Sequence, residues 1–129
     1  MSTLALTETT QDFMEPWRKK IESALDQGGT AHSFEDIVAA VENGTLLFWT
    51  AEDSCAVTEI VTYPNFRDFH VFLAAGTLEE IKDMYSSFET YAKELGCKVM
   101  SLSGRRGWKK GLSDLGFQEA HVTLAKEIY

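Results

Sequence analysis

The chain has 129 residues, of which 44% are hydrophobic and 12% aromatic, and its formal net charge at pH 7 is −8. This length and apolar content predict one domain, spanning 1–129, with a substantial core, and exclude a disordered or fibrous protein. The acidic excess disfavours nucleic acid and anionic membrane surfaces as partners, because both carry negative charge. No apolar run approaches the roughly 18 residues of a membrane span, and the N-terminus lacks a signal-like basic region, so a cytoplasmic protein is expected.

The cysteines and histidines bear on redox state and metal binding. Cys55 and Cys97 each fall within a predicted strand. Buried free thiols in a reducing compartment are favoured over a disulfide, which remains the alternative. The three histidines are scattered, with no cysteine or histidine at ligand spacing, and therefore predict no metal site.

Two helices are predicted in the first third of the chain. Apolar residues recur at helical spacing over 13–25, and Pro16 fits this helix only in its first turn, where its missing amide hydrogen matters least. Ser33 and Asp36 have the spacing of an N-terminal cap, and Gly44 is the stop signal of the helix that follows.

An antiparallel meander is predicted after these helices. Residues 46–50 are apolar and short, as in a buried strand, and 55–63 form a longer strand after a polar turn. A second turn leads into an aromatic and aliphatic strand at 66–75. Leu4 and Leu6 give only a weak indication of an additional strand at the N-terminus.

The strand at 66–75 is followed by the strongest helix signal in the chain. Thr77 and Glu80 have the spacing of a capping box, in which the threonine hydroxyl accepts the Glu80 amide hydrogen and the carboxylate returns to the threonine amide. An apolar stripe then runs along 78–95, and a second strand is predicted at 97–103. A strand, a crossover helix and a second strand predict parallel pairing with a right-handed connection.

The C-terminal part predicts a short helix and a last strand. Trp108, Leu112 and Leu115 share one helical face, which ends at Gly116. The last strand is predicted from apolar residues that alternate with polar ones: Ala120, Val122, Leu124 and Ile128. The whole chain thus predicts an α/β fold, with helices covering both faces of a mixed sheet.

This order of elements resembles the GCN5-related N-acetyltransferase fold (GNAT, the acyl-CoA N-acyltransferase fold). The most specific similarity is 104–117 (GRRGWKKGLSDLGF), which resembles the family's fourth-helix segment with its terminal Gly-Phe. Residues 94–99 (ELGCKV) resemble the family's step from helix to strand. The chain is also similar to short GNAT-like proteins of tailed phages and prophages, which implies a bacterial or phage-infected host cell.

The resemblance implies an acetyl-CoA site from which this chain departs. The family holds the coenzyme's pyrophosphate on a loop of the form Gln/Arg-x-x-Gly-x-Gly/Ala before the long helix, and the cofactor-binding candidates here are Ala75, Gly76 and Thr77. This junction has one glycine and no basic residue, and acidic residues stand beside the expected diphosphate. Leu112 occupies the place of the family's general-acid tyrosine. No cofactor is therefore expected, or acetyl-CoA if the protein is an enzyme.

A basic cluster forms the other cofactor-binding candidate. The resemblance places Arg105 and Arg106, with Lys109 and Lys110, near the approach of the 3′-phosphate of coenzyme A. The alternative is an exposed first turn of a helix, where positive charge is mildly unfavourable.

The candidate catalytic residue is Glu59, on a strand face shared with apolar residues. There it could act as the base that deprotonates an amine. The favoured alternative is a carboxylate that reaches solvent or pairs with Arg67. Asp68 and His70 lie two apart and hence on one face, as an oriented imidazole or, more simply, a structural pair.

Two hypotheses follow for function. The first is a GNAT-like domain of phage or prophage origin that has lost the cofactor and works through a protein partner. The alternative is an active N-acetyltransferase that moves an acetyl group from acetyl-CoA to an amine. The oligomeric state is open, and a homodimer is compatible with the sequence.

Overall fold

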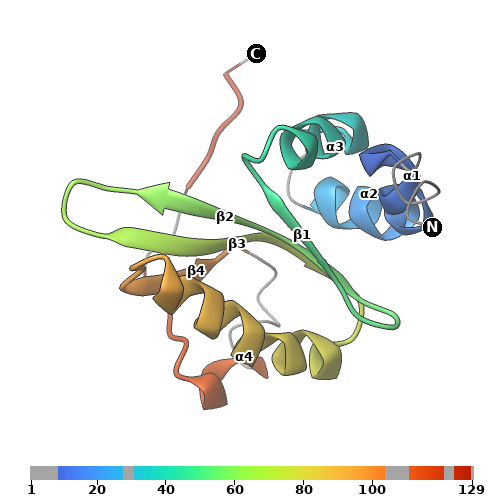
Figure 1. Ribbon diagram of the computed structural model, residues 1–129. Coiled ribbons are helices and arrows are strands. Elements are labelled where there is room, and N and C mark those ends of the chain that lie inside the picture. The colour runs from blue at the N-terminus through green and yellow to red at the C-terminus, as the bar shows by residue number, and fades with distance from the viewer. Residues whose placement is uncertain (1–8, 28–30, 104–110, 121–123, 129) are drawn as a thin grey trace.

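The computed structural model describes residues 9–27, 31–103, 111–120 and 124–128 (Figure 1). The helical elements are α1 (Thr10–Met14), the 3₁₀ turn η2 (Glu15–Trp17), α2 (Arg18–Gln27), α3 (Phe34–Glu42), α4 (Leu78–Glu94) and the 3₁₀ turn η3 (Ser113–Leu115). The strands are β1 (Leu47–Thr50), β2 (Cys55–Thr62), β3 (Arg67–Ala75) and β4 (Val99–Leu102).

The four described strands form one mixed sheet in the order β1-β2-β3-β4. β1 pairs antiparallel with β2, and β2 pairs antiparallel with β3. β3 and β4 run parallel, joined by α4. The predicted meander and the predicted crossover are both confirmed.

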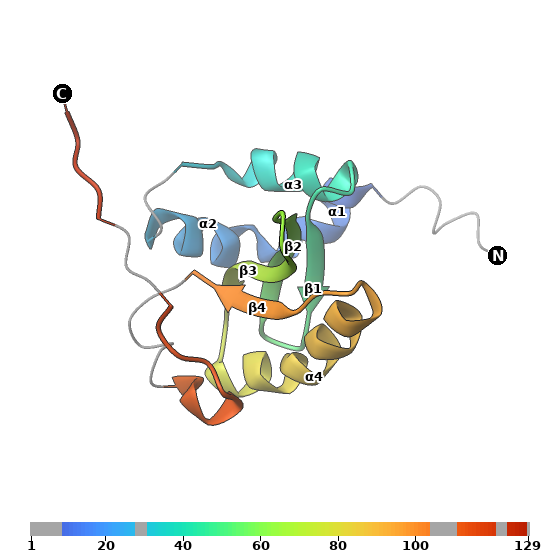
Figure 2. The same cartoon turned by 90° about the vertical axis from the view of Figure 1, so that its left-hand side faces the viewer.

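Helices cover both faces of the sheet, as predicted. Figure 2 shows α1, α2 and α3 in one layer, the sheet in the middle and α4 on the opposite side. Arg18 of α2 contacts the first residues of α3: its guanidinium lies 3.0 Å from the carboxylate of Glu35, 17 positions later, and 4.3 Å from the centre of the Phe34 ring. Arg18 therefore links α2 to the start of α3.

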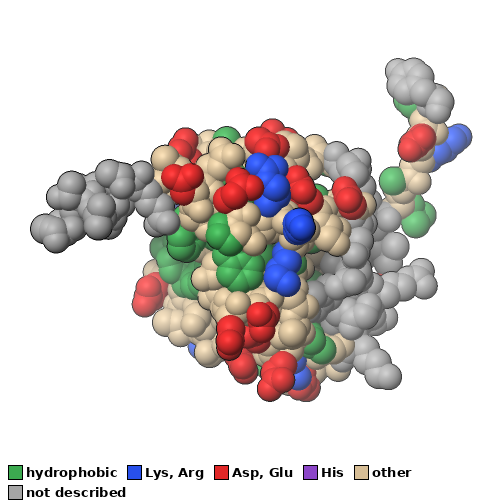
Figure 3. All heavy atoms as spheres, turned by 90° about the vertical axis from the view of Figure 1, so that its right-hand side faces the viewer, with side chains coloured by type: hydrophobic (Ala, Val, Ile, Leu, Met, Phe, Trp, Pro, Cys, Tyr) green, Lys and Arg blue, Asp and Glu red, His purple; other side chains and the backbone are tan. Residues whose placement is uncertain are grey.

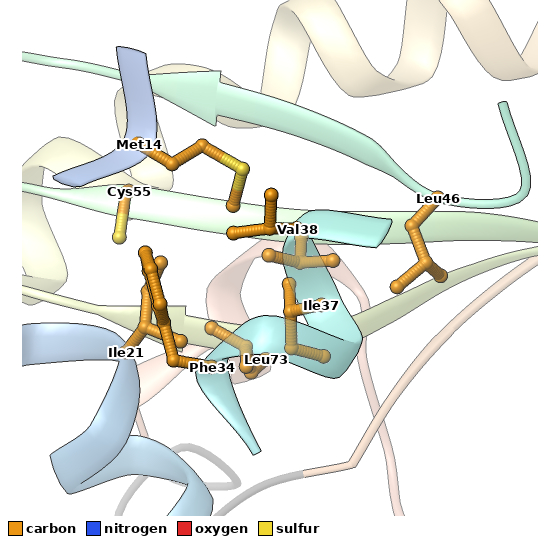
Figure 4. Close-up of a cluster of buried hydrophobic side chains, with 9 residues drawn as sticks. Met14, Ile21, Phe34, Ile37, Val38, Leu46, Cys55 and Leu73 are labelled. Carbon is orange, nitrogen blue, oxygen red and sulfur yellow. The ribbon is translucent and has the colours of Figure 1, made fainter. Parts of the chain in front are cut away.

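Each face of the sheet has its own apolar cluster. The cluster under α1–α3 is shown in Figure 4, and its members come from these helices, from the residue before β1, and from β2 and β3: Met14, Ile21, Phe34, Ile37, Val38, Leu46, Cys55, Val57 and Leu73. The cluster under α4 is built around Phe69 and Phe88, whose rings lie 5.5 Å apart. Trp49 packs edge-on against Phe88 and donates its indole N–H to Thr58 at 2.8 Å.

The start of α3 matches its prediction, and the first helix does not. Ser33 and Asp36 form a complete capping box, and hydrogen bonding from Ser33, above all from its backbone amide, lowers the pKa of the Asp36 carboxyl. In the first helical region α1 and α2 are separate helices, with Pro16 in the 3₁₀ turn between them. A proline inside one continuous helix would remove a backbone hydrogen bond, and the turn avoids this loss.

The predicted last strand is wrong in the described part of the C-terminal segment. Residues 117–120 and 124–128 have no strand structure, and Figure 1 shows 124–128 leading away from the sheet. Leu124 and Ile128 are 89% and 78% exposed, so their apolar alternation has no sheet to pack against. Val122, Leu4, Leu6 and 104–110 lie outside the described residues; of the predicted short helix, Gly111 is helical and η3 follows.

The described helices include none with the length and apolar character that crossing a bilayer requires. Both cysteines are free thiols, as favoured from the sequence, although only Cys55 is fully buried. Burial raises the pKa of the Cys55 thiol to about 11.

We predict that Cys55 resists alkylation in the native protein, because it is both inaccessible and protonated at pH 8. Cys97 is half-buried and should react with iodoacetamide first. Peptide mass spectrometry after timed labelling measures both rates, and labelling in urea is the control that should bring them together. Equal rates in the native state would contradict the packing of Cys55.

Candidate functional site

The described part of the chain contains a cleft of about 850 Å³ at the point where β3 and β4 separate. The two strands pair from Asp68 with Val99 to Val71 with Leu102. Beyond this point β3 continues to Ala75 without β4 beside it, and 72–76 line the cleft together with Leu102 and Ser103. The backbone edge of β3 is therefore free of β4 along the cleft.

A bulge in β3 lies next to this separation. Val57 pairs with Leu73 and Thr58 pairs with Val71, which leaves Phe72 as an extra residue. Phe72 and Leu73 consequently both pack against the cluster under α1–α3, whereas Val71 and Ala74 belong to the cluster under α4. The bulge reverses the alternation of β3 where the cleft opens.

Both helical layers contribute walls to the cleft. One wall comes from α4 and the segment after it, including Ile81, Tyr85, Leu112 and Phe117. Another comes from α2 and the chain before α3, including Lys19, Lys20, Ala24 and His32. Leu112 is only 4% exposed, so this residue, at the position of the family's acid tyrosine, is part of the apolar packing.

Tyr85 is a cleft residue that the sequence indicated only as part of an apolar stripe. Its hydroxyl donates to Glu89 at 2.8 Å, and this hydrogen bond, helped by burial, raises the pKa of the phenol. The ring packs edge-on against Phe117 at 5.9 Å. Residues four positions apart lie next to each other on a helix, and this spacing could have indicated the Tyr85–Glu89 pair from the sequence.

At one end of the cleft, the start of α4 is occupied by side chains of this chain. Thr77 caps the helix by accepting the Glu80 amide hydrogen at 3.2 Å, which is half of the predicted capping box. The other half is wrong, because the Glu80 carboxylate accepts from the Ser54 hydroxyl at 2.6 Å and from the Asp53 amide at 3.1 Å. The Thr77 amide donates to Ser54 at 2.9 Å instead.

Gly76 is the point of closest approach between this turn and Ser54. Its φ is +125°, and a Cβ built there would lie 2.1 Å from the Ser54 oxygen. Ser54 is fully buried. The absence of a side chain at Gly76, which could allow a phosphate to approach the backbone, here allows Ser54 of the β1–β2 turn to do so.

The predicted base, Glu59, lies half-buried on the cleft and opposite His70 in the β2–β3 register. Arg67 donates to the Leu95 carbonyl oxygen at 2.9 Å, and the described side chains form no ion pair between Arg67 and Glu59. Ala75 and Gly76 also line the cleft, with Thr77 next to them. Arg105 and Arg106 lie outside the described residues.

Asp68 and His70 share a face, as predicted, and Ser101 of β4 joins them. The Ser101 hydroxyl donates to Asp68 at 2.6 Å and lies 2.8 Å from His70 Nδ1. His70 Nε2 lies 3.2 Å from the hydroxyl of Ser103. The sequence analysis missed both serines, because only the register of β4 against β3 brings them next to His70. Across the described ranges no three acidic, histidine or cysteine side chains are grouped as metal ligands.

No protein-family model matches the sequence, and curated protein sequences give no match. Solved structures do resemble it. An aminoglycoside N-acetyltransferase, AAC(6')-Iy in complex with CoA, has a TM-score of 0.66 at 15% identity and covers 92% of this chain and 91% of its own. The BH1408 protein from Bacillus halodurans has a TM-score of 0.64 at 15% identity, covering 93% and 96%. A Trypanosoma brucei acetyltransferase has a TM-score of 0.60 at 10% identity, covering 88% and 94%.

These likenesses show the GNAT fold, and they confirm the fold predicted from the sequence. At such low identity they concern the fold alone.

We predict that Ser54→Ala lowers the free energy of unfolding by about 1–3 kcal/mol, because it leaves the Thr77 amide without a partner and removes one of the hydrogen bonds to the Glu80 carboxylate. Ser87→Ala, on the exposed face of α4, is the matched control and should change stability by less than about 0.5 kcal/mol. Urea unfolding measures both values. Equal stability of the two variants would mean that Ser54 does not hold this turn.

Proposed function

We propose that this chain is a GNAT-fold protein, encoded by a phage or prophage, that no longer uses acetyl-CoA and works through protein contacts. The observation that carries the proposal is the start of α4, where Ser54 fills the space beside Gly76. A pyrophosphate would need exposed amides and a glycine at this turn. Here the chain's own side chains occupy these positions.

Charge supports the same proposal. Glu79 and Glu80 lie in the first turn of α4, and Glu52 and Asp53 belong to the adjoining β1–β2 turn. Figure 3 shows acidic side chains on the face that contains this turn and the start of α4. Like charges about 4 Å apart repel by about 4 kcal/mol near a protein surface, so a diphosphate here is disfavoured.

An exposed aromatic surface supports a role in protein contacts. Tyr63 and Phe66 flank the β2–β3 turn with their rings 5.2 Å apart, and they are 46% and 37% exposed. Val99, at the start of β4, is 39% exposed. Exposed aromatic side chains are enriched at protein interfaces and supply much of their binding energy.

The open cleft favours a second candidate, an active N-acetyltransferase. In this alternative Glu59 deprotonates an amine, the amine attacks the thioester of acetyl-CoA in a ternary complex, and Arg105 and Arg106 hold the 3′-phosphate. The cleft lies beside Glu59 and is large enough for a small ligand, and the similar AAC(6')-Iy structure contains CoA. The blocked start of α4 ranks this candidate second.

Calorimetry and thermal shift with acetyl-CoA test the two candidates. We predict no heat of binding and no rise in melting temperature at millimolar acetyl-CoA, because Ser54 occupies the start of α4. The melting temperature is a valid measure, since any ligand that binds the native state must raise it. S-acetyl-pantetheine, which has the thioester arm and no phosphates, is the matched ligand. Micromolar binding of acetyl-CoA, much tighter than binding of the phosphate-free arm, would overturn the proposal and leave the N-acetyltransferase.

We also predict that, in a Ser54→Gly background, Glu80→Gln gives measurable pyrophosphate binding at the start of α4. Ser54→Gly frees the Thr77 amide and the space beside Gly76, and Glu80→Gln removes a negative charge. Glu94→Gln, the same change at the far end of α4, is the control and should give none. Phosphorus NMR titration measures both. Equal responses of the two variants would show that the acidic turn is not what excludes phosphate.

A further inference from the structure

Four side chains form a continuous chain of hydrogen bonds across β3 and β4, from a buried carboxylate to an exposed hydroxyl. Asp68 is 7% exposed and accepts from Ser101, Ser101 contacts His70 Nδ1, and His70 Nε2 contacts Ser103. His70 is half-buried, and Ser103 is exposed. Both of these last residues line the cleft.

The parallel register puts these four residues together. His70 pairs with Ser101, and in each strand the two polar residues are two positions apart. Phe69 and Val71 pack under α4, as do Met100 and Leu102, so the polar residues between and beside them point to the opposite face. The polar chain is therefore separated by the sheet from the apolar cluster under α4.

The direction of each hydrogen bond follows from its buried end. A carboxylate only accepts hydrogen bonds, so the Ser101 hydroxyl hydrogen is used in the hydrogen bond to Asp68. The Ser101 oxygen must then accept from His70, which places the imidazole hydrogen on Nδ1. Nε2 is left with its lone pair and accepts from the Ser103 hydroxyl. Ser103 thus donates to an unprotonated imidazole nitrogen.

Asp68 has a feature that folding alone does not favour. Its Oδ1 is buried and has no hydrogen-bond partner within the described ranges. A buried carboxylate with an unsatisfied oxygen costs free energy, and such groups occur where a site needs the charge. A carboxylate behind an imidazole stabilises the imidazolium that forms when the ring takes a proton.

We infer that Ser103 is a nucleophile that His70 activates as general base, with Ser101 and Asp68 as positioning residues. The Ser103 oxygen attacks the carbonyl carbon of an acyl ester or thioester, and its proton moves to His70 Nε2. The bond to the alcohol or thiol breaks, the leaving group takes this proton, and an acyl ester of Ser103 remains. In the second step a water oxygen attacks the acyl carbon while its proton moves to His70 Nε2. The bond from the acyl carbon to Ser103 Oγ breaks, Ser103 takes the proton back from His70, and the free acid leaves.

The cleft defines the class of substrate as an ester or thioester with a small acyl group. On the α1–α3 side of the sheet the cleft lining includes Phe72 and Leu73, which suit an apolar group. No phosphate-binding element enters this inference. It goes beyond the proposed function, and an outcome for coenzyme binding at Gly76 leaves it unaffected.

The test uses p-nitrophenyl acetate and the full chain. We expect a burst of about one p-nitrophenolate per chain followed by slower turnover. After acid quenching within the burst, peptide mass spectrometry should map one acetyl group per chain to Ser103. Ser103→Ala should lose this adduct, and His70→Gln should slow its formation about a hundredfold, as for loss of a general base. Ser87→Ala, which removes an exposed serine of α4 outside the cleft lining, should leave the rate unchanged.

Ser101 is tested by a readout that a purely structural role would not change. ¹⁵N NMR of the native protein should show the His70 imidazole protonated on Nδ1 and unprotonated on Nε2. Ser101→Ala should lose this preference and slow acetylation, whereas Ser101→Thr, which keeps the hydroxyl, should retain both. Acetylation of Lys19 or Lys20 in place of Ser103, or a native imidazole protonated on Nε2, would overturn the inference.

Discussion

The short parallel contact between β3 and β4 is the constraint on which the rest of the molecule depends. It lasts from Asp68 to Val71, and the bulge at Phe72 follows at once. At the bulge, two consecutive residues of β3 pack under α1–α3. Beyond this point β3 remains paired with β2 although it no longer pairs with β4. The cleft is a consequence of this difference in length, and both helical layers border it.

The start of α4 shows how the same backbone feature can serve a ligand or the fold. A glycine before a capped helix offers amides and close approach to a phosphate. In this chain Ser54 takes that place and connects the β1–β2 turn to α4 through Thr77 and Glu80. The contacts that stabilise this turn thus occupy the amide and the space that an anion would need.

Local patterns predicted the elements well, and contacts between distant residues limited the rest. Ser33 and Asp36 form their box because both partners lie in one turn. Glu80 does not return to Thr77, because Ser54, 26 positions earlier, competes for its carboxylate. The C-terminal alternation failed as a strand signal because alternation supplies no pairing partner.

The two ends of the cleft differ in what sequence could reveal and in their chemistry. The turn at Gly76 corresponds to a family motif, so the sequence alone showed that it differs from the motif. Ser103 was recognised only from the register of β3 with β4. Gly76, the residue after β3, is six positions from His70, which is roughly 20 Å of extended chain. At this distance a change in phosphate binding need not alter the hydrogen bonds of His70. The proposed loss of nucleotide binding at one end is therefore compatible with the proposed nucleophile at the other.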